Sequence, residues 1–186
     1  MCGCGGGDAI RAVLPKLLST AQRLVLDADA LNAIADDAQL QTLLKARHFR
    51  GYGTVLTPHP LETARLAGLT TPQVQADRLQ VALQLAEHFG VMVVLKGSGT
   101  VIAGPGRTTA INASGNALLA TAGTGDVLAG MVGSWWAGGL DPFDAATGAV
   151  FAHGRMADDW ALARPGQPLT ASRLASTGGG RVNTSG

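Results

Sequence analysis

The run 122–130 surrounds a single carboxylate with glycines at the expected start of a helix. Its centre is Gly123, Thr124, Gly125 and Asp126. Glycines let the backbone turn sharply, so that successive N–H groups and the helix dipole can face an anion such as phosphate. A carboxylate in the same place suits a base, or an organiser of water and metal, beside a phosphoryl group in transfer. From spacing alone a plain helix cap explains the run equally well, because Asp is ordinary near helix starts.

A second polar run, 57–62, follows a short apolar stretch that predicts a buried strand. Two prolines stiffen the exit from that strand and direct His59 and Glu62. A His side chain can contact a substrate, and a Glu carboxylate can hold Mg²⁺ through water. Without further context, a surface loop before a capped helix is the favoured interpretation of this run.

A third run consists of Lys96, Gly97, Ser98, Gly99 and Thr100, directly after another apolar strand signal. Lysine at a strand end suits a phosphate group, and the glycines would let a nucleotide lie close to the backbone. A simple β-turn explains an isolated K-G-x-G better.

The remaining polar signals are weaker. The opening glycine loop, 3–7, lacks the complete G-x-G-x-x-G pattern and has no strand before it in this chain. His48, His88 and His153 show no metal-ligand spacing, so we expect surface or packing roles for them.

The composition indicates one domain of 186 residues with a hydrophobic share of 46% and a charged share of 15%. A formal net charge of +1 argues against a nucleic-acid groove or a polybasic membrane patch. Cys2 and Cys4 are too close for a disulfide framework and too few for a metal site, which indicates free thiols in a reducing compartment. With no signal peptide and no membrane-length apolar stretch, we expect a cytoplasmic protein.

Hydrophobic periodicity predicts short buried strands that alternate with helices. The expected strands lie at 24–27, 54–56 and 91–95, followed by a hairpin of 101–102 and 110–111 around 104–106. The expected helices lie at about 10–18, 36–46, 61–66, 71–89, 126–136 and 142–163, with Asp8 and Thr71 as N-caps and a kink at Pro15. The segment 112–124 is expected to be a loop.

This alternation predicts an α/β fold with a mostly parallel sheet flanked by helices. Ligands of such sheets bind beyond the carboxyl ends of the strands. Asp27, Asp29, His59 and Lys96 fall at those ends, so the sequence places them on the expected binding side.

Taken in order, five segments resemble the ADP/ATP-dependent NAD(P)H-hydrate dehydratase family, which belongs to the ribokinase-like superfamily. They are GCGGGDA, LVLDADALN, LTPHPLETARLAG, VVLKGSGTVI and ATAGTGDVLAGMV. The resemblance extends over about residues 3–171. It implies a ribokinase-like fold and an enzyme that uses ADP or ATP, with Mg²⁺, to remove water from hydrated NADH and NADPH. The ring hydroxyl would be phosphorylated, and phosphate would then leave.

The resemblance also implies roles for the matching positions. Asp126 would activate or contact the substrate hydroxyl, and Glu62 would organise Mg²⁺ through water. The nucleotide would be held by Lys96, Gly97, Ser98, Gly99, Thr100, Gly123, Thr124 and Gly125, of which the last three form the anion hole. The hydrated substrate would contact Gly5, Gly7, His59, Glu62, Arg65 and Asp126.

The sequence departs from the family pattern at Cys4, where proline is usual, and at Ala117 and Leu118, where Pro-Gly is frequent. Because the family's domain begins well before the first glycine loop, the resemblance assigns 1–175 to the carboxy-terminal portion of an N-terminally incomplete domain. The tail, 176–186, is rich in Gly, Ser and Thr and is expected to be disordered. A sheet without its neighbours would expose an apolar edge, so we expect a homo-oligomer or pairing with an absent segment.

Two other interpretations stay open. A small-molecule kinase of the same superfamily, such as a hydroxyethylthiazole or pyrimidine kinase, would carry the same G-T-G-D run. The run 57–62 and the G-x-G-G-G loop favour the dehydratase over a kinase. A nucleotide-binding fragment without activity is the third possibility, and the complete set of site residues argues against it.

Overall fold

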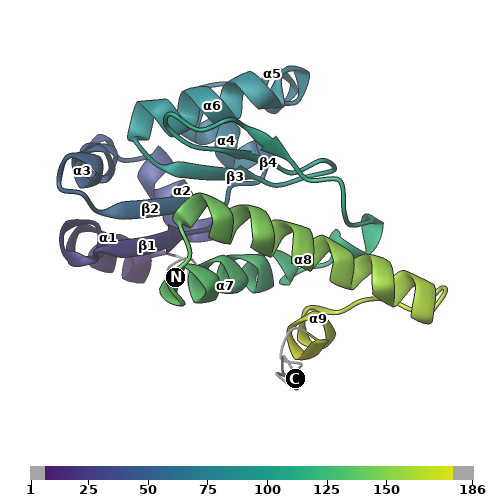
Figure 1. The fold of residues 1–186 in the computed structure, drawn as a ribbon. Coiled ribbons are helices and arrows are strands. Elements are labelled where there is room, and N and C mark those ends of the chain that lie inside the picture. The colour runs from purple at the N-terminus through teal and green to yellow at the C-terminus, as the bar shows by residue number, and fades with distance from the viewer. Residues whose placement is uncertain (1–6, 178–186) are drawn as a thin grey trace.

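The computed structural model describes residues 7–177, which form a central sheet between two layers of helices (Figure 1). Cys2, Cys4 and Gly5 lie outside the described residues, as does the expected tail from residue 178 onward. No helix within 7–177 combines the length and the apolar character needed to cross a bilayer.

The sheet has the strand order β1-β2-β3-β4-β5 and confirms the expected α/β architecture. Three parallel strands, β1 (Arg23–Leu26), β2 (Gly53–Leu56) and β3 (Met92–Leu95), are followed by an antiparallel hairpin of β4 (Val101–Ala103) and β5 (Ala110–Ile111). Parallel strands need a long crossover, and here helices supply each one. The carboxyl ends of β1, β2 and β3 therefore open on the same side of the molecule.

One face of the sheet is covered by helices from the first half of the chain (Figure 1). These are α1 (Asp8–Thr20), α2 (Ala28–Ala35), α3 (Ala38–Phe49), α4 (Pro60–Ala67) and α6 (Arg78–Phe89), with the short α5 (Thr71–Ala76) before α6. Strand residues that point to this face, such as Leu26, Leu56 and Leu95, are completely buried against them.

The opposite face packs against α7 (Thr124–Ala137) and α8 (Pro142–Ala163), which lie side by side (Figure 1). The alternate strand residues Val25, Val55 and Val94 are buried on this side. Because successive strand side chains point to opposite faces, each strand contributes to two separate cores. This double burial explains why the strands appear in the sequence as continuous apolar runs.

The prediction of a single helix at 71–89 is wrong, because the helix is interrupted at Asp77. The Asp77 side chain accepts the N–H of Gln80 and caps α6, so a new helix begins there. The N-cap of α5 is Thr70 rather than Thr71, because Thr70 and Gln73 form a capping box.

Other boundaries also differ from the expectation. Asp8 is the first residue of α1, and Gly7, at φ 78°, is the N-cap; the helix continues through Pro15. The helix α2 was not expected, and the expected loop 112–124 contains the 3₁₀ turn η1 (Ala117–Leu119). The helix α9 (Ala171–Thr177) includes the first two residues that composition had assigned to the tail.

Candidate active site

The start of α7 is a glycine turn fixed by a threonine side chain. Gly123 is the N-cap at φ 84°, a left-handed conformation that favours glycine. The hydroxyl of Thr124 donates to the carbonyl oxygens of Leu119 at 2.6 Å and Thr121 at 2.8 Å. Asp126 lies in the first turn of the helix and is exposed. The structure thus has the helix N-terminus that the sequence predicts at this run.

Lys96 lies directly against this helix start. Its Nζ is 2.7 Å from Oδ1 of Asp27, and a Cβ added to Gly125 would come within 3.3 Å of the same nitrogen. The carboxylate of Asp27 makes no capping bond to α2, so it is directed to Lys96 instead. Ala28, next to Asp27, has a φ of 47°, a strained conformation of the kind that clusters at functional sites. A larger residue at 125 would displace the lysine ammonium by a few tenths of an ångström.

The turn after β3 is held by Arg78, a residue that the sequence interpretation did not select. Its guanidinium donates to the carbonyl oxygens of Leu95 at 2.9 Å and Lys96 at 3.2 Å, and also to that of Ser98. Gly97 has a φ of 144°, and a Cβ there would lie 2.9 Å from Nη2 of Arg78. Burial lowers the pKa of Arg78 from its ordinary value. The arginine therefore acts as a clamp on the backbone of the lysine turn.

His59 and Glu62 form a capping box at the start of α4. Oε2 of Glu62 accepts the His59 backbone N–H at 2.8 Å, and Oε1 lies 3.3 Å from the His59 Nε2. Both oxygens of this buried carboxylate are thus engaged by one residue. Arg65, one turn further, is exposed and donates to Oδ1 of Asn32 at 2.6 Å.

Several of the predicted site residues line a cavity of about 1060 Å³. Its walls include His59, the turn 96–100, the segment 111–117 and the α7 residues Thr124 and Gly125. The volume is sufficient for a nucleotide-sized ligand. Of the remaining predicted residues within the described part of the chain, Gly7, Glu62, Arg65, Gly123 and Asp126 do not line this cavity.

His153 on α8 is buried, which fits the packing role expected for it, and it also lines the cavity. It is 6% exposed, and its Nε2 lies 2.9 Å from the carbonyl oxygen of Thr124. Burial lowers the pKa of His153, the hydrogen bond to Thr124 partly opposes this, and the charge of Lys96 lowers it further. The contact depends on packing between α7 and α8, so no local sequence pattern marks it.

The segment after β5 is tied to α8 by a second carboxylate. Asp158 accepts the Gly115 N–H and a side-chain N–H of Asn116, both at 2.9 Å. A Cβ added to Gly154 would come within 2.7 Å of the Ser114 carbonyl carbon, so the two backbones touch there. These contacts fix one wall of the cavity against the same helix that carries His153.

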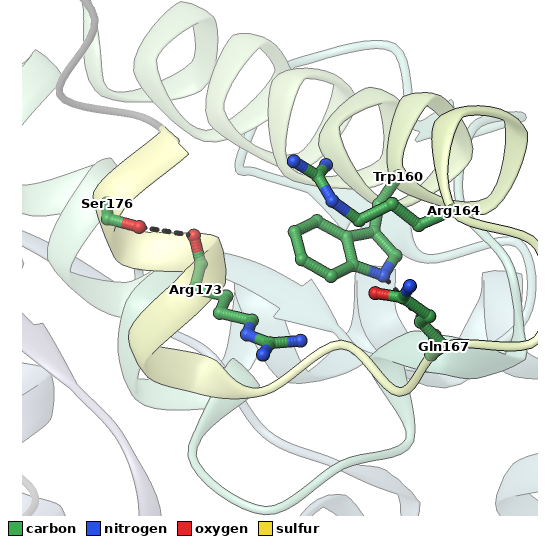
Figure 2. A pocket seen from close by; sticks show the side chains of 5 residues that line it. All are labelled: Trp160, Arg164, Gln167, Arg173 and Ser176. Carbon is green, nitrogen blue, oxygen red and sulfur yellow. Dashed lines mark hydrogen bonds between the residues drawn. The ribbon is translucent and has the colours of Figure 1, made fainter.

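A smaller hollow of about 390 Å³ shares no lining residue with the large cavity (Figure 2). The guanidinium carbons of Arg164 and Arg173 lie 4.2 and 5.3 Å from the ring centroid of Trp160. The indole N–H donates to the Gln167 carbonyl at 3.3 Å. Arg164 is the C-cap of α8, which carries Trp160, so of these two contacts only that of Arg173 joins α9 to the end of α8.

Residues 2–177 match the family model described as NAD(P)H-hydrate dehydratase. The chain belongs to this family. The ADP-dependent (S)-NAD(P)H-hydrate dehydratase of Neisseria meningitidis is 45% identical over 159 residues, which cover 84% of this chain and 52% of the relative. A bifunctional NAD(P)H-hydrate repair enzyme of Escherichia coli is 37% identical over 175 residues, or 94% of this chain and 32% of the relative. The chain thus spans about half of the first dehydratase and about a third of the second protein.

Solved structures confirm the ribokinase-like fold. The ADP/ATP-dependent NAD(P)H-hydrate dehydratase of Bacillus subtilis, co-crystallised with ATP and Mg²⁺, has a TM-score of 0.77 and 30% identity over 92% of this chain and 58% of that chain. A ribokinase-like superfamily protein of Enterococcus faecalis has a TM-score of 0.75 and 26% identity, covering 93% and 57%. A hydroxyethylthiazole kinase protein of Pyrococcus horikoshii, at 22% identity and TM-score 0.69, covers 94% and 67% and shows the shared fold alone.

The dehydratase-family site contains no ready metal-binding cluster in the part of the chain from 7 to 177: no three His, Cys, Asp or Glu side chains there could hold an ion together. Mg²⁺ usually keeps several waters and takes one or two carboxylates together with phosphate oxygens.

Proposed function

We propose that this chain removes water from hydrated NADH and NADPH in a reaction that consumes ADP or ATP. Membership of the dehydratase family supports the reaction class. The observation that carries the proposal is the Lys96 ammonium group, which is paired with buried Asp27 and lies against Gly125 at the start of α7. A fixed cation beside the N–H groups of a helix start, at the edge of a large cavity, suits a polyphosphate.

The site residues take the roles that the sequence predicts. Lys96 and the turn 97–100 hold the nucleotide, and the backbone of Gly123, Thr124 and Gly125 forms the anion hole. Asp126, in the first turn of α7, accepts the proton of the substrate hydroxyl. The proposed contacts of the hydrated ring are Gly5, Gly7, His59, Glu62, Arg65 and Asp126.

Two successive bond changes would complete the reaction. In the first, the terminal phosphoryl group of the nucleotide leaves its bridging oxygen and bonds to the ring hydroxyl oxygen, whose proton passes to Asp126. In the second, the ring C–O bond breaks, phosphate departs with the electron pair, and loss of a neighbouring ring proton restores the double bond. Phosphorylation is needed because hydroxide is a poor leaving group, whereas phosphate is a good one.

Mg²⁺ would neutralise charge on the transferring phosphoryl group while phosphate oxygens and water bind it. Glu62 is the carboxylate proposed to contact this ion through water. Its two oxygens also contact the backbone N–H and the ring of His59.

Association of the chain with itself, or with another polypeptide segment, is part of the proposal. Among the described strands, β1 pairs with β2 alone, which leaves one edge of β1 to accept a partner. Sedimentation analysis should show a dimer or larger species, and a monomer at all concentrations would remove self-association. We also propose a cytoplasmic location from the composition.

The test of the proposed activity mixes purified chain with NADH hydrate, Mg²⁺ and either ADP or ATP. The proposal predicts a nucleotide-dependent rise in the near-ultraviolet absorbance of NADH, with phosphate released in equal amount. A stable phosphorylated product without NADH would instead identify a small-molecule kinase. A folded chain that binds nucleotide but yields neither product would be a nucleotide-binding fragment.

A further inference from the structure

His153 lies behind the first turn of α7, and the roles proposed above leave it without a function. It is almost fully buried, yet its ring forms part of the cavity wall. Its Nε2 faces the carbonyl oxygen of Thr124 at 2.9 Å. A carbonyl oxygen only accepts hydrogen bonds, so Nε2 carries the ring proton and donates it.

This hydrogen bond also controls a neighbouring donor. The peptide unit between Thr124 and Gly125 is planar, and no cis peptide bond occurs among the described residues. In a trans peptide the C=O and the N–H point in opposite directions. A bond that fixes the Thr124 carbonyl therefore fixes the Gly125 N–H, which is one of the groups without a helical partner at the start of α7.

His153 adds to the support of a peptide that has glycine neighbours. Gly123 and Gly125 flank Thr124, and glycine restricts the backbone less than any other residue. The side chain of Thr124 is held by the hydrogen bonds from its hydroxyl to the Leu119 and Thr121 carbonyl oxygens. The ring of His153 fixes the carbonyl end from the opposite helix.

We infer that His153 is a positioning residue that aims the Gly125 N–H at the phosphate groups of the bound nucleotide. The inference rests on the proposed function for the location of those phosphates. A donor that is already oriented before the ligand arrives needs no reorganisation when charge appears beside it. His153 therefore acts through the α7 backbone and need not touch the nucleotide.

The electrostatic surroundings keep the ring in the required form. Burial and the charge of Lys96 both lower the pKa of His153. The ring is therefore neutral at neutral pH and carries a single N–H, which the Thr124 carbonyl takes.

Comparing the binding of a ligand that has phosphate groups with one that has none distinguishes this role from a packing role. His153→Phe keeps a ring in the buried site but removes the donor, whereas His153→Gln keeps a side-chain N–H at similar reach. His88→Phe is the matched control, because His88 is exposed on α6 and its ring contacts Phe89. The measurement is the calorimetric dissociation constant of each variant for ADP with Mg²⁺, and for adenosine.

We expect His153→Phe to weaken ADP binding about tenfold, the loss of one hydrogen bond to a charged group, and to change adenosine binding no more than about twofold. His153→Gln should recover most of the ADP affinity, and His88→Phe should match the wild type. Equal weakening of both ligands, or unchanged ADP binding, would overturn the inference. A wild-type chain that binds ADP but does not dehydrate NADH hydrate would contradict the proposed function. The dissociation constants for ADP and adenosine would still decide the role of His153 in that case.

Discussion

The Nζ of Lys96 lies 2.7 Å from Oδ1 of Asp27, and this ion pair joins the carboxyl ends of β3 and β1 beneath the start of α7. The side chain of Asp27 is 3% exposed and that of Lys96 is 20% exposed. Removing one partner of a buried pair leaves the other as an uncompensated charge. The pair therefore supports the fold as well as the proposed nucleotide site.

Lys96→Met should lower the free energy of unfolding by about 3 kcal/mol, measured by urea denaturation. Combining it with Asp27→Asn should recover part of that loss, because the double variant has no unpaired buried charge. The exposed pair of Arg11 and Asp36, at 3.3 Å, supplies the control, and Arg11→Met should cost about 1 kcal/mol or less. Equal losses in Lys96→Met and Arg11→Met would show that burial does not strengthen the pair.

Arg47 is a second buried cation, with a structural role. It is completely buried and donates to the carbonyl oxygens of Leu18 at 2.9 Å and Gly53 at 2.8 Å, and to Oγ1 of Thr54 at 2.7 Å. Arg47→Met should lower the free energy of unfolding by about 3 kcal/mol, because these acceptors lose their donors. The exposed neighbour offers Arg50→Met as a control, expected within about 0.5 kcal/mol of wild type. Matching denaturation midpoints for the two variants would contradict this role.

The sequence predicts the elements whose signals are local. Each strand is a short apolar run because both sheet faces are covered, and the glycine turn at Gly123 marks the start of α7. The break at Asp77 escaped prediction because apolar residues continue at helical spacing on both sides of it. From the sequence alone, an Asp in such a stretch is indistinguishable from an exposed residue inside a helix. The capping bond of Asp77 depends on the folded backbone.

The site was predictable only in part. Lys96 and Thr124 stand in glycine-rich runs with a recognisable chemistry, so the sequence selected them. Arg78 and His153 act on backbone carbonyls of other elements, and nothing in their own neighbourhoods indicates this. Such contacts depend on which helices the fold places side by side.

Arg78→Met should weaken ADP binding about tenfold by releasing the backbone of the turn 96–99, since three carbonyl acceptors lose their common donor. Calorimetry with ADP and Mg²⁺ measures this effect. Arg155→Met removes an exposed arginine that pairs with Asp159 on α8, and its ADP affinity should equal that of the wild type. An Arg78 variant with unchanged affinity would mean that the turn keeps its shape without the clamp.

The lowered pKa of His153 makes stability depend on pH. In the unfolded chain the pKa is near the ordinary value of 6.5, whereas burial holds it lower in the folded chain. As the pH falls through 6.5, the unfolded state gains a proton that the folded state does not, so stability declines until the pH passes the lowered value. The free energy of unfolding should therefore fall less steeply over this range in His153→Phe than in the wild type. Identical slopes would contradict a buried neutral ring.

Asp126 is the residue on which the proposed chemistry depends most directly. Asp126→Asn keeps the size of the side chain but removes its basicity, so it should lower turnover by at least about a hundredfold. The affinity for ADP should change no more than about twofold, because the phosphate donors remain.

The deciding measurement is the initial rate of NADH formation from NADH hydrate with Mg²⁺ and saturating ADP or ATP, in the wild type and in Asp126→Asn. Calorimetry on the same samples establishes that both bind nucleotide. We expect an active wild type and a variant that binds ADP but does not turn over. Wild-type rates in Asp126→Asn would show that this carboxylate takes no part in the chemistry and would contradict the proposed mechanism.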